Sequence, residues 1–508
     1  MRRSKPALTH STSLILLMML AYAVCLAQKD GDPISIGTYR VIHSDILKED
    51  RLLYIHLPEG YQDTQQRYPV LYILYAQLYN YVADAAIITE KLGGAGEAPP
   101  LIIVGVANTN RYRDLLPVKS RTIAESGGAD NFLKFLEAEL IPYVDRTYRT
   151  KQFRILAGPQ AGAVFSLYAL ITLPNLFQAT ISENPFMNPD NAEHLLPLSE
   201  QFFRKRTALR HHLYIRCEKN ERAQQLEPAR RFAALLDSTK PLGFKVKVEF
   251  KEPSGDFIPA LPFSEALRSI FAGHKLPADF RTSSLQDILN YYEQRSEEYG
   301  FPVDPPDLML TFEGGRLQQR GMMREAIEIF NHQLQLNPKS LNALLQLGES
   351  YRGLGEFEEA RKCYKGFLDI RQTDAAFIQR RLGEMERVID SSAAYRIEKE
   401  IRRNGIQSAL KTYRQIKADP SRSLYFAENE FNAMGYRLMG AGNLEAALEI
   451  FKLNVQLNPQ SANVYDSLGE VYLKVGDNDN ATKHYKKSLE LNPQNTNARE
   501  VLKQLEKK

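Results

Sequence analysis

The stretch Arg154–Leu170, "RILAGPQAGAVFSLYAL", decides how the first half of this chain folds. An apolar run leads into a Gly-x-x-x-Gly turn, from Gly158 to Gly162, and a helix-like apolar pattern follows. This order is typical of a strand that turns sharply into a helix and presents one side chain at the apex. In an enzyme the apex residue is usually a nucleophilic Ser, but here it is Gln160. The turn therefore predicts a strand–helix unit and leaves its chemistry in question.

Short β-rich runs surround this turn between about Ile34 and Phe271. They are RLLYIHLP (51–58), YPVLYILY (68–75), LIIVGVAN (101–108), FRILAG (153–158), ATISEN (179–184), HLYIRCE (212–218) and KVKVEF (245–250). Helix-length segments, such as residues 128–148, lie between several of them. Strands that alternate with helices predict a mostly parallel central sheet, covered on both faces. Such sheets carry their functional loops at the carboxyl ends of the strands.

From about Asp307 the strands stop and a repeat begins. Pairs of residues 34 positions apart carry the signal: Ala326 and Ala360, Ala447 and Ala481, Phe451 and Tyr485. This period predicts tetratricopeptide repeats, two near 308–374 and two near 427–494. A degenerate unit between them uses Ala409 and Tyr413 and carries a few extra residues. The last segment, 495–508, predicts a capping helix, so the fold class is α/β plus all-α.

Four segments follow from these patterns. Residues 1–27 combine a basic start, "MRRSKPALTH", with an apolar core that ends in small residues, which predicts a secretory signal peptide cleaved after Ala27. An uncleaved membrane anchor is the alternative, but the apolar run is short for a spanning helix. Residues 28–275 predict the α/β domain, 276–306 a connecting helix and Pro-rich linker, and 307–508 the repeats. We expect the protein in the periplasm or secreted.

The composition excludes several kinds of function. The chain has 508 residues, 44% apolar and 25% charged, with a net charge of +4, so we expect no nucleic-acid partner and no membrane contact beyond the signal peptide. Its three Cys provide no disulfide framework. Its nine His form no cluster with metal-ligand spacing, so we expect neither a metal nor a cofactor.

The first half resembles the bacterial esterase family of α/β-hydrolases, the esterase D and enterochelin-esterase-like group. The motifs that carry the resemblance are YPVLYIL, IIVGVANTNRYRDLLP, GGADNFLKFLEAELIPYVDRTYRT, RILAGPQAGAVFSLYAL and PNLFQATI. The resemblance covers nearly all of residues 34–271 and implies an α/β-hydrolase fold. It also implies a Ser-His-acid triad that hydrolyses esters, with two backbone N–H groups holding the oxyanion.

The triad positions implied by the resemblance are changed in this chain. The family's Gly-His-Ser-x-Gly turn keeps both glycines, Gly158 and Gly162, but has Gln160 at the nucleophile position. The family's His-Gly is replaced here by Ser254-Gly255. Glu218 and Glu221 are both candidates for the acid. No catalytic residue is therefore assigned, because a carboxamide is neither basic nor nucleophilic.

The loop opposite the turn differs from the family as well. The family's Leu-Asp-Gly is Leu74-Tyr75-Ala76 here, so Ala76 and Ala161 stand at the oxyanion positions. Tyr75, Gln77 and Tyr79 are candidate pocket residues for a small ligand, with loop packing as the alternative.

These changes predict a pseudo-hydrolase. Its α/β domain would bind or scaffold, with a vestigial pocket for a small molecule, and the repeat groove would bind a protein or peptide. The alternative is an ester hydrolase with a divergent site, in which Glu183, Glu218 or Glu221 activates water.

Overall fold

The computed structural model of this chain describes residues 35–77, 81–252, 260–371, 375–419 and 423–506. The expected signal peptide and Ser254 lie outside these ranges. The described residues form two compact units. The first takes the residues up to Glu313 together with His332–Lys339, and the second takes Gly314–Asn331 and the chain from Ser340 onward. The domain boundaries expected at 275 and 306 stay predictions.

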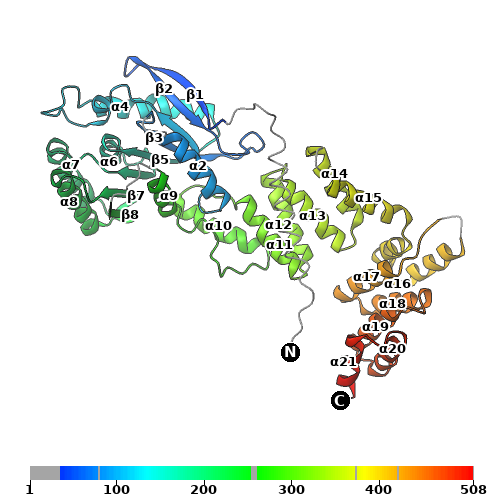
Figure 1. Cartoon of the computed structure of the whole chain (residues 1–508). Coiled ribbons are helices and arrows are strands. Elements are labelled where there is room, and N and C mark those ends of the chain that lie inside the picture. Colours follow the sequence, from blue (N-terminus) through cyan, green and yellow to red (C-terminus); the bar gives the residue numbers. More distant parts are fainter. Residues whose placement is uncertain (1–34, 78–80, 253–259, 372–374, 420–422, 507–508) are drawn as a thin grey trace. The chain divides into compact units, whose positions relative to one another are not determined.

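The first unit is built on an eight-stranded, mostly parallel sheet (Figure 1). Its strands are β1 (Thr38–Ser44), β2 (Glu49–His56), β3 (Tyr68–Leu74), β4 (Ile102–Val106), β5 (Thr150–Pro159), β6 (Ala179–Glu183), β7 (Ala208–Glu218) and β8 (Leu242–Lys251). The spatial order is β1-β2-β4-β3-β5-β6-β7-β8. Only the β1–β2 and β2–β4 pairs are antiparallel among these strands. The expected α/β fold is confirmed.

The central strands of this sheet are apolar because helices cover both faces. Every residue of β3, YPVLYIL, is buried, as a doubly covered parallel strand requires. The seven strands predicted from the sequence are present, and β1 is an addition to them. Its residues are almost all exposed, so β1 lacks the buried apolar run that marked the others.

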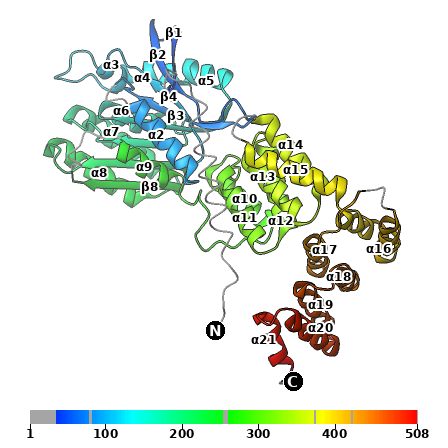
Figure 2. The same cartoon turned by 45° about the vertical axis from the view of Figure 1, so that its right-hand side comes forward.

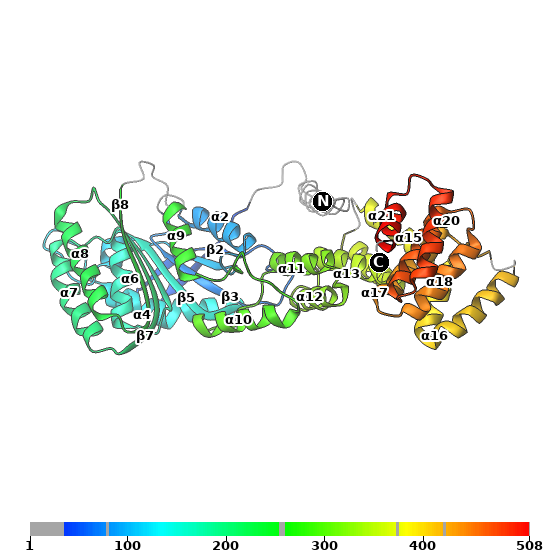
Figure 3. The same ribbon diagram turned by 90° about the horizontal axis from the view of Figure 1, so that it is seen from below.

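The helices of the first unit lie on two sides of the sheet (Figure 3). The Ser182 hydroxyl donates to the Ala163 carbonyl of α6 at 3.0 Å, whereas the next residue, Glu183, accepts from Tyr81 of α2 at 3.1 Å. Because side chains alternate along a strand, α6 and α2 cover opposite faces. These helices are α2 (Tyr81–Gly94), α3 (Arg111–Leu115), α4 (Ala129–Phe135), the π-helical turn η1 (Leu136–Leu140), α5 (Ile141–Thr147), α6 (Ala161–Thr172), α7 (Pro189–Arg204), α8 (Ala223–Thr239), α9 (Ala260–Ile270) and α10 (Leu285–Tyr299).

Helix α10 is the expected connecting helix, and it is packed into the first unit. Ser284 caps its start in a capping box, and Gly300 ends it with φ +78°. Its Tyr292 and Tyr299 are buried and donate to the carbonyls of His274 and Ala272. This helix therefore adds to the core of the unit.

The repeat region is entirely helical among its described residues (Figure 2). Its helices are α11 (Asp307–Gln319), α12 (Met323–Leu336), α13 (Leu341–Gly353), α14 (Phe357–Ile370), α15 (Ala376–Ser391), α16 (Ala393–Ala418), α17 (Glu428–Gly440), α18 (Leu444–Leu457), α19 (Ala462–Lys474), α20 (Asn478–Leu491) and α21 (Thr496–Leu505). The predicted capping helix is α21. Its Ala498 and Leu502 pack with Ala481 and Tyr485 of the last repeat.

Each regular repeat is held by a glycine that faces an aromatic ring. A Cβ on Gly348 would lie 2.5 Å from a ring carbon of Tyr364, and one on Gly435 would lie 2.6 Å from Phe451. Such distances are shorter than any real Cβ contact, so these positions exclude larger residues. The glycine lets the two helices of a repeat approach, and the aromatic ring fills the space between them.

The degenerate unit contains an additional helix and a helix that is broken at a glycine. Helix α16 contains Gly405 with φ +82° and ψ +173°, so it is two helices joined at that residue. The second of them carries Ala409 and Tyr413, both buried. The extra residues expected from the sequence form α15, which lies between α14 and this pair.

Candidate functional site

The strand β5 turns into helix α6 through a single strained residue, Gln160. Its φ is +49° and its ψ is −109°. Its N–H donates to the Glu183 carbonyl at 2.9 Å, and its own carbonyl accepts from the Phe186 N–H at 3.1 Å. The side chain is exposed. A non-glycine residue held at such an angle costs about 1–3 kcal/mol, and such strain persists where the surrounding structure fixes it.

The close approach of strand and helix favours glycine at position 158, whereas a side chain at position 162 would meet only ordinary contacts. A Cβ on Gly158 would lie 3.0 Å from the Gly162 Cα and 3.2 Å from the Leu74 Cβ. A Cβ on Gly162 would lie 3.4 Å from the Leu74 Cβ. The backbone geometry of a nucleophile elbow is thus present, with a carboxamide in place of a nucleophile.

The backbone N–H groups of the loop after β3 are hydrogen-bonded within the protein. The Ala76 N–H donates to the Val106 carbonyl at 3.1 Å, and the Tyr75 N–H donates to the Asn108 Oδ1 at 3.0 Å. Ala161 opens α6 and is 3% exposed, at a position whose N–H has no acceptor within its helix. Of the two expected oxyanion positions, Ala76 and Ala161, Ala76 has an N–H group that already donates a hydrogen bond within the protein.

Asn108 holds this loop, and sequence reasoning missed it. Its side chain is 3% exposed, and its Nδ2 donates to Asp114 at 3.1 Å. Its backbone exchanges two hydrogen bonds with the Gln77 amide, at 2.8 and 3.2 Å. Asp114 is paired in turn with the buried Arg51 at 2.8 Å. The available signal was a polar residue directly after strand β4.

The expected pocket residues are engaged with neighbours. Arg111 donates to the hydroxyls of Tyr75 and Tyr112 at 2.8 and 2.7 Å, and its guanidinium lies 5.1 and 4.5 Å from their ring centroids. The ring of Tyr75 is therefore covered by a cation. Gln77 is bonded to Asn108, and Tyr79 lies outside the described residues.

Glu183 is the titratable group next to the elbow. It ends β6 beside Pro159 and is half-buried. Burial raises its pKa to about 7, and the nearby charge of Glu218 adds to the rise, whereas the hydrogen bond from Tyr81 and the charge of Arg216 lower it. A carboxyl with a pKa near neutrality at a strand end is a candidate functional group.

The two candidate acids lie near different neighbours. Glu218 ends β7, its N–H donates to the Asn184 Oδ1 at 2.7 Å, and its charge acts on Glu183. Glu221 follows in the turn before α8, and its charge acts on Cys217. The acid assignment stays a prediction, as does the replacement of the base by Ser254.

Within the described ranges, no group of three or more His, Cys, Asp or Glu side chains is arranged to hold a metal ion. None of the helices described here has the length and apolar character to cross a membrane. Cys217 and Cys363 are free thiols, and burial raises the pKa of both.

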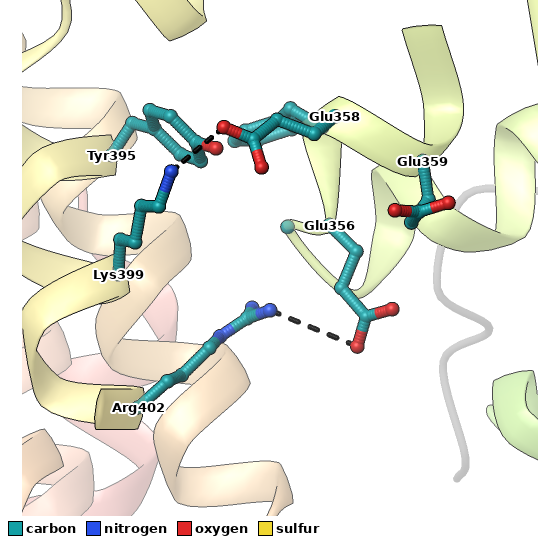
Figure 4. Close-up of a pocket in the computed structure, with 8 residues that line it drawn as sticks. Glu356, Glu358, Glu359, Tyr395, Lys399 and Arg402 are labelled. Atoms are coloured by element: carbon teal, nitrogen blue, oxygen red, sulfur yellow. Dashed lines mark hydrogen bonds and ion pairs between the residues drawn. The ribbon is translucent and has the colours of Figure 1, made fainter. Parts of the chain in front are cut away.

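A hollow of about 150 Å³ lies between the start of α14 and helix α16 (Figure 4). Lys399 donates to Glu358 at 2.7 Å, and Arg402 lies 3.7 Å from Glu356. Glu359 is paired with Lys362 at 2.8 Å. Because these charges already have partners, the hollow is better explained as a joint between two repeats than as a ligand site.

The comparisons with protein families divide the chain in the same way. Residues 44–227 match the family model described as "Putative esterase". Residues 317–379 and 462–495 match models of the tetratricopeptide repeat.

Individual relatives agree with the first match. The chain is similar to the ferri-bacillibactin esterase BesA of Bacillus subtilis, at 30% identity over 137 residues that cover 23% of this chain and 47% of that protein. It is also similar to the uncharacterized protein YjcH of the same organism, at 27% over 145 residues that cover 28% of this chain and 58% of that protein. The chain thus spans about half the length of the curated relatives it matches.

A solved structure shares the fold. The IroE-like serine hydrolase from Shewanella oneidensis is 23% identical to this chain, with a TM-score of 0.51. The match covers 59% of this chain and 99% of that one. At this identity the likeness is one of fold.

Proposed function

We propose that this chain, which carries an esterase-family domain followed by tetratricopeptide repeats, is a pseudo-hydrolase that binds a small acyl compound without turning it over. One observation carries the proposal. The elbow keeps its strained backbone and both of its glycines, but Gln160 stands at its apex. Removing the nucleophile from a comparable triad enzyme costs on the order of 10⁶ in kcat.

The loop opposite the elbow supports the same proposal independently. A tetrahedral intermediate needs backbone donors that are free to meet its oxyanion. Here the N–H groups of Tyr75 and Ala76 are both bonded within the protein. A serine restored at position 160 would therefore meet an incomplete oxyanion site.

The ligand class is proposed from the named relative. That relative is named as an esterase of ferri-bacillibactin, which supports ferri-bacillibactin or its acid fragments as the first ligands to test. The repeats support protein–protein interaction, and we propose that they bind a protein or peptide. Peptide-array binding by the whole chain tests this, with Gly435→Leu as the control, since a side chain there would collide with Phe451.

The decisive experiment is hydrolysis of p-nitrophenyl acetate and butyrate by the purified chain. We expect the wild type to match both buffer and a Gln160→Ala variant. A Gln160→Ser, Ser254→His double variant run beside them should show weak turnover at most. Wild-type turnover above buffer that Gln160→Ala or Glu183→Gln abolishes would contradict the proposal.

A second candidate function rests on Glu183. Its pKa of about 7 suits a general base that activates water at neutral pH, which would make the chain a divergent ester hydrolase. Such activity should rise with pH through about 7 and disappear in Glu183→Gln, while Gln160→Ala keeps it. A rate that is flat across this range would exclude this candidate.

We also propose secretion or a periplasmic location, on the basis of the N-terminal sequence. Mass measurement of the protein recovered outside the cytoplasm should give a chain that begins at Gln28. A chain of full length in the membrane fraction would favour the anchor instead.

A further inference from the structure

Arg216 lies beside the elbow, on the face of the sheet that α2 and α9 cover. It aligns with Glu183 in the pairing of β6 and β7, and Glu183 accepts from Tyr81 of α2 on that face. Tyr214, two residues earlier on the same strand, donates to Glu265 of α9 at 3.2 Å. Because alternate residues of a strand share a face, the Arg216 side chain is on the α2 and α9 side as well.

This guanidinium is buried without hydrogen-bond partners for two of its nitrogens. Arg216 is 3% exposed, and neither its Nε nor its Nη1 has a hydrogen-bond partner among the described residues. Buried donors are satisfied in nearly all proteins, and a buried charge normally has a partner. Two unused donors on one buried cation therefore call for an acceptor.

Other arginines that have a buried nitrogen without a hydrogen bond show what is missing. Each of them keeps a carboxylate partner within 2.6–3.1 Å. These pairs are Arg51 with Asp114, Arg154 with Asp145, Arg295 with Glu298 and Arg381 with Glu349. Within the described part of the chain, Arg216 has no such ion pair.

Three carboxyl groups lie near Arg216, and the charge of one depends on pH. Glu183 and Glu249 align with it on the two neighbouring strands, and Glu218 follows on its own strand. Burial holds the pKa of Glu183 near 7, so at slightly acidic pH this side chain is neutral. An oxyanion at Arg216 would then face two carboxylates rather than three, and Glu249 is already engaged by Tyr214 and Lys251.

We propose that Arg216 binds the carboxylate of an acidic acyl ligand beside the elbow, so that the domain holds the acid rather than the ester. The inference rests on the proposed function, because it names the ligand class of the same site. The guanidinium N–H groups would donate hydrogen bonds to the carboxylate oxygens, as arginines do in other carboxylate sites. Inorganic phosphate offers the same oxyanion chemistry without the acyl group.

The test is calorimetric titration of the purified chain at pH 6 with benzoate, benzamide and inorganic phosphate. We expect benzoate to bind, and benzamide, its uncharged analogue, to bind at least tenfold more weakly. Arg216→Met should weaken benzoate at least tenfold, and Arg216→Lys should weaken it less because the charge remains. The matched control is Arg210→Met, an exposed arginine at the other end of the same strand.

Each outcome decides the inference. Benzoate that fails to bind the wild type, or that binds Arg216→Met equally well, overturns it. Phosphate that binds as tightly as benzoate would overturn the carboxylate assignment and leave a general oxyanion site. If Arg216→Met fails to fold by circular dichroism, Arg216→Lys carries the comparison. Ester turnover in the separate hydrolysis assay would overturn the proposed function without changing the meaning of these titrations.

Discussion

At Gln160 the backbone has an unfavourable conformation, but the side chain is not the nucleophile that such a turn usually presents. The left-handed φ of +49° is fixed by the N–H and carbonyl bonds to Glu183 and Phe186. Tyr75 and Asn184, which follow the ends of two nearby strands, also have positive φ values of +59° and +45°. Strained residues that gather at one edge of a sheet are typical of functional sites.

This strain predicts that Gln160→Gly stabilises the protein. Glycine adopts a positive φ without penalty, so the gain, after its own entropy cost, should be about 1 kcal/mol. Urea denaturation measures it. Gln152→Gly, an exposed site earlier in the same strand, should instead destabilise by about 0.5–1 kcal/mol. An equal loss at both positions would show that the elbow is not strained.

Glu183 makes stability depend on pH in an unusual direction. Its pKa rises from 4.5 to about 7 on folding, chiefly because of burial, so the folded state binds the proton more tightly. Its contribution to stability is present below pH 4.5 and is lost as the pH rises to about 7. Denaturation between pH 4.5 and 8 should therefore show the stability of the wild type falling, relative to that of Glu183→Gln, as the pH rises. The exposed Glu137→Gln should give a constant difference.

At the scale of the helices, small residues set the spacing of the repeats. Adjacent glycines in α11 allow a direct test. A Cβ on Gly314 would lie 2.4 Å from a ring carbon of Phe330, whereas nothing lies within 4 Å of one on Gly315.

We predict opposite effects from the two alanine substitutions. Gly314→Ala should destabilise by about 1–3 kcal/mol through overpacking. Gly315→Ala should stabilise by about 1 kcal/mol through helix propensity. Thermal unfolding of both variants beside the wild type measures the effects. If both lower the melting temperature equally, the contact with Phe330 is not what selects glycine.

Elements with a strong period could be predicted from sequence, and those without one could not. The buried run of β3 and the alanines at intervals of 34 residues led to the correct elements. The exposed strand β1 has no apolar run and was missed. Helix α15 was expected only as extra residues, because no repeat position marks an inserted helix.

The site could be predicted from the sequence only where its residues are neighbours in the chain. The elbow is local, so its two glycines and Gln160 were found in one motif. Asn108 contacts the loop through a side-chain hydrogen bond and Arg216 aligns with Glu183 through strand pairing, and neither stands in a recognisable pattern. Their importance follows from what surrounds them, which only the three-dimensional structure supplies.

At the scale of the molecule, the buried histidines of the first unit predict its response to acid. Burial lowers the pKa of His211 to about 3 and of His212 and His274 to about 4. These side chains stay neutral in the folded state but take up protons when unfolded, so stability is lost as the pH falls below 6.5. The raised pKa of Glu183 has the opposite effect on stability, but it is one group against three histidines.

We therefore expect acid to loosen the α/β unit before the repeats. In the second unit, His484 is less buried, and its pKa is lowered by burial as well. Hydrogen exchange at pH 7, 5.5 and 4.5, corrected for intrinsic rates, should show loss of protection first in β5, β6 and β7. Earlier loss in α17–α20 would contradict the prediction. His43→Gln, at an exposed site, is the control.

The bonds of the loop at Tyr75 and Ala76 bear on the history of the protein. Under the proposed function, a serine at position 160 would gain little rate while those N–H groups stay bonded to Asn108 and Val106. Under the proposed function, ancestral reconstruction should find the loop and the elbow altered together, with no lineage in which hydrolysis was lost and regained.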